Sequence, residues 1–111
     1  LPGIMRDSHH VETELGILPA ALTSQETNTN THAVDVFLRP SDIEFDEASN
    51  TYATITHKAF LGAEILYTVR LDSGVTLLLL ASSSVNRTIG NRTGIRLRSY
   101  HPKKAIIFSH P

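Results

Sequence analysis

Short runs of strand-forming residues follow one another along most of this 111-residue chain, and most of them end at a glycine, a proline or a polar turn. Valine, isoleucine and threonine are plentiful, and no long window repeats its apolar residues with the 3.6-residue period of a helix. Residues 51–60 alternate in side-chain type, and residues 64–71 place Ile65, Tyr67 and Val69 on one face. The pattern excludes a helical body and predicts an all-β fold.

The remaining runs extend this prediction. Further strands are expected at residues 3–7, 11–15, 33–38, 75–81, 95–98 and 105–108, with one helical turn at residues 41–44. The near-continuous apolar run at 75–81 predicts a central strand with both faces covered, and residues 23–31 and 82–92 predict loops.

Five or six short strands joined by tight turns, one of them bent at Gly62, are typical of a small OB-like Greek-key barrel. We expect residues 1–31 to form an extra N-terminal β-hairpin and a polar loop, and residues 32–111 to form the barrel.

The composition narrows the function classes. The chain has no cysteine, which excludes disulfides and Cys-ligated metal sites, and no apolar run approaches the ~18 residues of a membrane span. It carries no Gly-x-x-x-x-Gly-Lys-Ser/Thr loop and no Gly-x-Ser-x-Gly elbow. We therefore predict no catalytic residue in this chain.

The net charge of −1 hides an asymmetry along the sequence. Residues 1–72 hold all 11 acids and 4 basic residues, whereas residues 73–111 hold 6 basic residues and no acid. One interpretation is that strands from the two parts pair and offset each other's charge. The alternative is a basic surface that meets an acidic partner.

Several motifs in fixed order resemble the TOBE (transport-associated OB) domain, the C-terminal accessory domain of bacterial ABC importer ATPases. The resemblance rests on the phrase Arg39-Pro40-Ser41-Asp42-Ile43, the bend Phe60-Leu61-Gly62, the hairpin Leu71-Asp72-Ser73-Gly74, the later Ile89-Gly90, and the final Ile106-Ile107-Phe108. The opening Leu1-Pro2-Gly3 and residues 11–16 are similar to the ferric-ion-type subgroup. In this family, the matching positions are structural, namely Arg39, Pro40, Asp42, Gly62, Gly74 and Gly90.

The resemblance implies that the chain is a piece of a larger ATPase subunit, cut from its nucleotide-binding domain. It implies no cofactor for this fragment, with ATP and magnesium bound by the parent protein. The implied partners are a second copy of the subunit (a homodimer), its own nucleotide-binding domain and the membrane permease subunits, and not nucleic acid. The implied location is the cytoplasmic side of the bacterial inner membrane, peripheral through the transporter complex. The candidate contact segments are the N-terminal hairpin and residues 95–99.

Three other functions remain as alternatives. A small oxyanion could bind the polar donors of Ser83, Ser84 and Arg87. A metal would need His9 or His10 together with Asp7 or Glu12, although adjacent residues of an extended chain point apart, and we predict no metal ligand. Single-stranded nucleic acid would need a basic groove with exposed aromatic residues, and the basic third supplies few aromatics.

Overall fold

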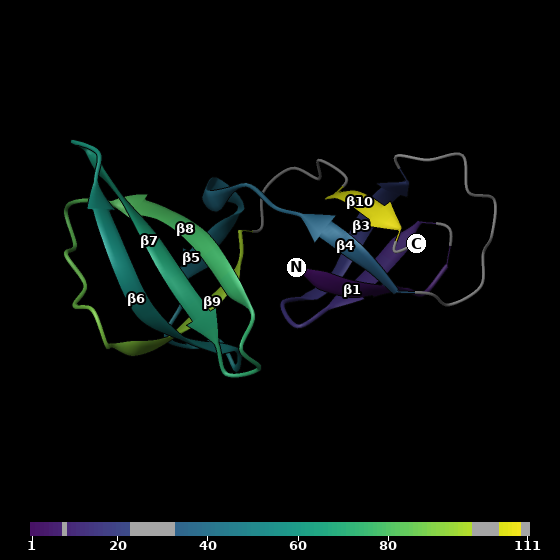
Figure 1. Ribbon diagram of the computed structural model, residues 1–111, viewed down its shortest axis with the longest axis horizontal. Coiled ribbons are helices and arrows are strands. Elements are labelled where there is room, and N and C mark those ends of the chain that lie inside the picture. The colour runs from purple at the N-terminus through teal and green to yellow at the C-terminus, as the bar shows by residue number, and fades with distance from the viewer. Residues whose placement is uncertain (8, 23–32, 99–104, 110–111) are drawn as a thin grey trace. The chain divides into compact units, whose positions relative to one another are not determined.

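The computed structural model describes residues 1–7, 9–22, 33–98 and 105–109, which belong to two compact units (Figure 1). The first unit combines Leu1–Leu38 with Ser99–Pro111, and the second is Arg39–Arg98. Within the described ranges, nearly all regular structure is β-strand and the one helical element is a single 3₁₀ turn. The predicted all-β, OB-like class is confirmed.

The first unit is a closed five-stranded barrel. In ring order its strands are β1 (Pro2–Met5), β2 (His10–Thr13), β3 (Gly16–Leu22), β10 (Ala105–Ser109) and β4 (Ala33–Phe37). β4 closes the ring by pairing with β1, and β10 runs parallel to β3 but antiparallel to β4. Closure removes free sheet edges, which is how OB-like barrels protect their backbone from further pairing.

The core of this barrel comes from strand residues that alternate inward and outward. Met5, Val11, Val34 and Val36 are buried together, and Leu1, Leu18 and Leu38 pack against them. Burying one such aliphatic side chain contributes about 1.5–3 kcal/mol. The burial of residues 33–37 alternates with a period of two, and the sequence had predicted a strand at residues 33–38.

Two details of the first unit differ from the sequence-based expectation. The N-terminal strands are part of the closed ring, and not a hairpin outside a barrel. Gly16, expected to end a strand, instead begins β3, and its φ of 119° lets the chain turn there. β3 was missed because its sequence lacks alternation; it is held by backbone pairing with β2 and β10.

The second unit is a five-stranded antiparallel sheet in the order β5-β9-β6-β7-β8. Its elements along the chain are η1 (Pro40–Asp42), β5 (Ile43–Phe45), β6 (Tyr52–Phe60), β7 (Glu64–Leu71), β8 (Thr76–Ser82) and β9 (Arg92–Leu97). The register between β6 and β7 shifts between Ile55 and His57, so Thr56 is a bulge residue. The helical turn expected at residues 41–44 is shorter, because Ile43 already pairs with Leu97 in the sheet.

One face of this sheet forms the core of the second unit. The buried apolar residues are Ile43, Ala53, Ile55, Ile65, Tyr67, Val69, Leu71, Leu77, Leu79 and Ile95. β8 was expected to be covered on both faces, but Leu78 is 45% exposed between the buried Leu77 and Leu79. The reason is that, in the described structure, no second layer covers the outward face of β8 at Leu78.

The predicted boundary between residues 31 and 32 lies outside the described residues, so that division stays a prediction. The described strands nearest to it group differently from the predicted domains, since β4 pairs with β1 and β10. The chain thus enters the second unit at Arg39 and leaves it at Arg98.

Candidate functional site

The second unit begins with a closed turn that brings together Arg39, Pro40 and Asp42. The Arg39 N–H donates to Asp42 Oδ2 at 2.8 Å, and the Asp42 N–H donates to the Arg39 carbonyl oxygen at 2.9 Å. Arg39 Nη2 also lies 3.6 Å from Asp42 Oδ1. Proline suits the first position of this turn because its fixed φ matches and its missing N–H costs nothing there. These three motif residues therefore shape the chain.

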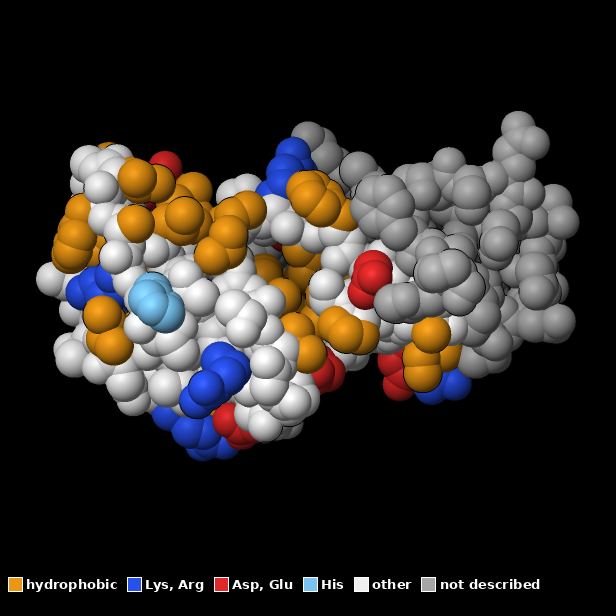
Figure 2. All heavy atoms as spheres, viewed as in Figure 1, with side chains coloured by type: hydrophobic (Ala, Val, Ile, Leu, Met, Phe, Trp, Pro, Cys, Tyr) orange, Lys and Arg blue, Asp and Glu red, His pale blue; other side chains and the backbone are white. Residues whose placement is uncertain are grey.

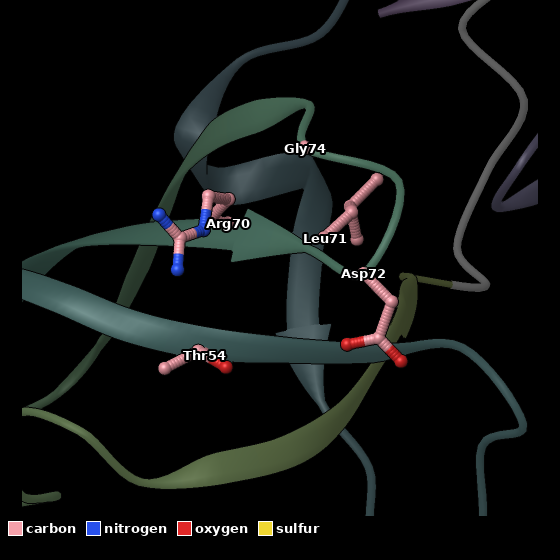
Figure 3. A pocket seen from close by; sticks show the side chains of 5 residues that line it. All are labelled: Thr54, Arg70, Leu71, Asp72 and Gly74. Carbon is pink, nitrogen blue, oxygen red and sulfur yellow. The ribbon is translucent and has the colours of Figure 1, made fainter.

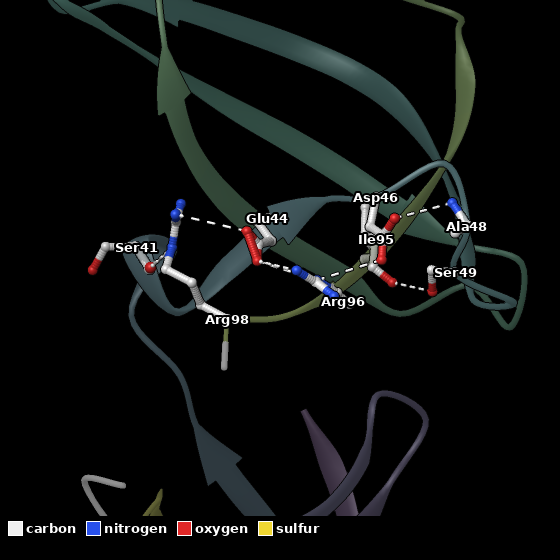
Figure 4. A network of polar contacts seen from close by, with 8 residues as sticks. All are labelled: Ser41, Glu44, Asp46, Ala48, Ser49, Ile95, Arg96 and Arg98. Carbon is white, nitrogen blue, oxygen red and sulfur yellow. Dashed lines mark hydrogen bonds and ion pairs between the residues drawn. The ribbon is translucent and has the colours of Figure 1, made fainter. Parts of the chain in front are cut away.

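Behind this turn, a row of charges links β5 to β9 (Figure 4). Arg98 Nε donates to the Ser41 carbonyl oxygen at 2.9 Å, and Arg98 Nη1 lies 3.8 Å from Glu44 Oε2. Arg96 donates to Glu44 Oε1 at 3.1 Å and its Nε lies 3.4 Å from Asp46 Oδ2. Acids from the first half of the sequence thus pair with bases from the second half, as the first interpretation of the charge asymmetry predicts.

The three motif glycines adopt backbone conformations with positive φ. Gly62 (φ 77°) lies in the β6–β7 turn, Gly74 (φ 98°) in the β7–β8 turn, and Gly90 (φ 92°) just before β9. The Leu61 N–H donates to the Glu64 carbonyl oxygen across the first of these turns. A side chain is strained at such φ values, so these positions favour glycine. That Gly62, Gly74 and Gly90 have only a structural role stays a prediction.

Sequence reasoning missed a fourth glycine, Gly94 in β9. Its φ is not positive, but a Cβ there would collide with the Asp46 carbonyl oxygen and lie 3.1 Å from the Ser49 carbonyl oxygen. The sequence pattern placed the strand at residues 95–98, with Gly94 before it, whereas β9 begins at Arg92 and Gly94 lies inside it, where a glycine marks a close backbone approach.

The candidate anion-binding loop between β8 and β9 uses its main-chain donors internally. The Ser83 N–H donates to the Ala63 carbonyl oxygen at 2.9 Å, and the Ser84 N–H donates to Ser82 Oγ at 3.2 Å. The Arg87 N–H donates to Tyr67 Oη at 3.1 Å. These three N–H groups are therefore not available to bind an anion in this conformation. Oxyanion binding by this loop stays a prediction.

Arg87 stacks within the same unit. Its guanidinium lies 4.3 Å from the centre of the Phe45 ring, and Phe45 meets the buried Tyr67 edge to face at 5.1 Å. Tyr67 Oη also donates to the Val85 carbonyl oxygen at 3.3 Å. This buried hydroxyl, which the sequence analysis did not single out, holds the loop against the core.

A shallow concavity lies at the opposite end of β6 and β7, lined by Thr54, Arg70, Leu71, Asp72 and Gly74 (Figure 3). The Arg92 guanidinium donates to the Asp72 carboxylate, with Nε 3.2 Å from Oδ1, and this holds the pKa of Asp72 below its ordinary value. The same hydrogen bond raises the pKa of Arg92. The Asp72 carboxylate among the lining residues makes this concavity a poor site for an anion.

The outward face of β6, β7 and β8 is exposed. Figure 2 shows hydrophobic side chains gathered over one end of these strands and basic side chains toward the other end. In register, Leu66 lies opposite Leu80, Thr68 opposite Leu78, and Arg70 opposite both Thr54 and Thr76. Tyr67 and its inward neighbours on β7 are buried on the other side.

The histidine candidates do not assemble into a cluster in the described residues. His10 Nδ1 lies 3.1 Å from Asp7 Oδ1, and the His9 N–H donates to the same oxygen at 2.7 Å, which lowers the pKa of Asp7. Glu12 instead pairs with Arg6. Among the described side chains, no three histidine or acidic residues are grouped closely enough to hold a metal ion.

Comparison with known protein families identifies the family of most of this chain. The TOBE domain family model matches residues 36–102, which span the whole second unit and the strand residues that lead into it. The chain belongs to the TOBE domain family. No curated protein matches the TOBE domain described here closely enough to count as a relative. Within the described ranges, no helix has the length and hydrophobicity needed to cross a bilayer.

The TOBE domain is a non-catalytic OB-like module. The motif residues close turns, the arginines of β9 pair with acids of β5 and of the β7–β8 turn, and the loop after β8 is tied to Tyr67. Among the described residues, the outward face of β6, β7 and β8 is one surface that stays exposed.

Proposed function

We propose that this TOBE domain is the C-terminal accessory, regulatory and dimerisation domain of an ABC importer ATPase subunit, with iron(III) or another small solute as the imported substrate. The family match over residues 36–102 is the observation that carries the proposal. The mechanism is mechanical: two copies hold their subunits together while the ATP-binding domains close and reopen.

In this proposal, ATP is bound and hydrolysed by another domain of the parent protein. The 111 residues contain no phosphate-cradling Gly-x-x-x-x-Gly-Lys-Ser/Thr loop, so ATP and magnesium belong to the nucleotide-binding domain and no cofactor to this fragment. Its partners are the second subunit, its own nucleotide-binding domain and the permease. Its place is the cytoplasmic side of the inner membrane, peripheral through the complex.

The ion pairs within this domain support a scaffold function more than the function of an anion receptor. Arg92, Arg96 and Arg98 all face carboxylates of the same unit. The main-chain donors of the serine-rich loop are likewise occupied. A scaffold needs rigid, self-satisfied turns, whereas an anion receptor needs preorganised free donors.

Sequencing the gene on both sides of this coding segment tests the proposal directly. We expect the same reading frame to encode a nucleotide-binding domain with a phosphate loop upstream of Leu1. A flanking sequence without such a domain would overturn the importer assignment. Calorimetry with iron(III), molybdate, sulfate and phosphate adds a second test, since stoichiometric binding of any of them would favour a ligand sensor instead.

A further inference from the structure

The outward face of β7 and β8 carries a group of leucines between oppositely charged ends of β7, and β6 adds the exposed His57 opposite Thr68. Leu66, Leu78 and Leu80 lie side by side on β7 and β8, and Leu78 is 45% exposed. Glu64 lies at one end of β7 and Arg70 at the other, and both are exposed on this same face. Along β7 the outward side chains are therefore an acid, a leucine, a threonine and a base, namely Glu64, Leu66, Thr68 and Arg70.

The two charges are symmetrically placed about the middle of β7. Each is three residues from Tyr67, whose own side chain points inward and is fully buried. Among the described residues, neither Glu64 nor Arg70 takes part in an ion pair. Both charges are thus free to meet another molecule.

This pattern is complementary to itself after a half-turn. When a two-fold axis lies in the plane of the face and runs across the strands, it reverses β7, so that Glu64 faces Arg70 of a second copy twice. The same operation sets Leu80 against the partner's Leu78 in the centre. An axis along the strands would instead oppose Glu64 to Glu64 and Arg70 to Arg70, which is repulsive.

We propose that two copies of this domain pack face to face through β6, β7 and β8, with their β7 strands antiparallel and two Glu64–Arg70 pairs at the ends. This inference rests on the proposed dimerisation role and names its surface. It replaces the sequence-based candidate at residues 95–99, because Arg96 and Arg98 are already paired with Glu44.

The size of the face sets the strength of the contact. Three strands about 4.8 Å apart and six residues at about 3.3 Å each give a face of roughly 14 Å by 20 Å. Two copies would bury roughly 600 Å², about half of the ~1,200 Å² at the lower end of stable interfaces. The contact is therefore weak by itself and becomes effective when two subunits are already tethered.

Charge exchange on the 111-residue chain tests the proposal. Self-association is measured at millimolar concentration and low salt, by concentration-dependent amide shifts and by sedimentation. Glu64→Arg or Arg70→Glu alone makes both end contacts repulsive and should weaken association about tenfold. The double exchange Glu64→Arg/Arg70→Glu should restore it, while Glu47→Arg, at an exposed turn position off this face, should leave it unchanged.

Cross-linking defines the orientation, because the chain has no cysteine of its own. A mixture of Glu64→Cys and Arg70→Cys chains, treated with a short bismaleimide, should give mainly the mixed 64–70 dimer. Mainly 64–64 and 70–70 products would overturn the antiparallel arrangement.

The outcomes separate this inference from the proposed function. Association that none of the charge variants alters would overturn the surface but leave a dimerising domain. Absence of any association at millimolar concentration would overturn the surface as well, and the importer role would then be judged from the flanking gene sequence alone.

Discussion

Gly94 and Asp46 meet backbone to backbone. The Asp46 N–H donates to the Gly94 carbonyl oxygen at 2.9 Å, while the carbonyl oxygen of Asp46 occupies the space that a Cβ on Gly94 would need. Because the obstacle is the backbone of a turn, it cannot move aside as a flexible side chain can. We expect Gly94→Ala to lower the free energy of unfolding by about 1–3 kcal/mol, measured by urea denaturation.

Gly62 supplies the matched comparison. It has open space around it but a φ of 77°, so Gly62→Ala should cost about 1 kcal/mol through backbone strain. Asparagine tolerates this φ, so Gly62→Asn should recover part of the loss, whereas Gly94→Asn should recover none. Equal recovery at both positions would contradict the steric explanation at Gly94.

Tyr67 links the core to the loop after β8 through its hydroxyl. Tyr67→Phe removes the acceptor of the Arg87 N–H and the donor to the Val85 carbonyl oxygen while keeping the ring that meets Phe45. We expect a loss of about 1–2 kcal/mol in unfolding free energy. Hydrogen exchange should show faster exchange of the Arg87 amide and unchanged exchange in β6. Unchanged protection of Arg87 would show that the loop is held by other contacts.

Sequence periodicity predicted the parts of the fold in which one face is buried. Residues 64–71 alternate in the sequence and alternate in burial, because a strand with one covered face separates its inward and outward side chains. The apolar run at residues 75–81 shows the limit of this rule. It predicted two covered faces, yet Leu78 is exposed, because an apolar run does not state whether a second layer covers the outer face of the sheet.

The candidate site was predictable only where local chemistry decided it. The turn from Arg39 to Asp42 follows from proline geometry and from a carboxylate three residues after Arg39. The pairing of Arg92 with Asp72 joins residues that are 20 apart, and that of Arg96 with Glu44 joins residues that are 52 apart. Such contacts depend on strand order, which the local sequence does not encode.

Asp72 should titrate below its ordinary pKa of about 3.9 because Arg92 stabilises its charged form. A lowered pKa in the folded state means that the pair stabilises the fold above about pH 4. That contribution is lost as the pH falls through the folded-state pKa. Arg92→Gln should raise the pKa of Asp72 toward its ordinary value, as followed by carboxyl NMR titration. The pKa of Asp7, lowered by the His9 N–H, should not change in this variant.

The paired arginines Arg96, in β9, and Arg98, just after it, predict weak or absent binding of single-stranded nucleic acid, although many OB-like barrels bind it. Arg96 and Arg98 share Glu44, and Arg96 also approaches Asp46, so contact with a phosphate would have to break existing ion pairs. We expect no binding of a fluorescent oligothymidylate by fluorescence anisotropy at about 50 mM salt.

The double variant Glu44→Gln/Asp46→Asn removes both acids that hold Arg96 and Arg98. It should therefore gain weak binding that disappears as salt is raised, because freed arginines attract phosphates mainly through counterion release. Clear low-salt binding by the unmodified chain would contradict this prediction, because it would show that these arginines remain available despite their ion pairs. The basic third of the sequence would then be a candidate nucleic-acid surface.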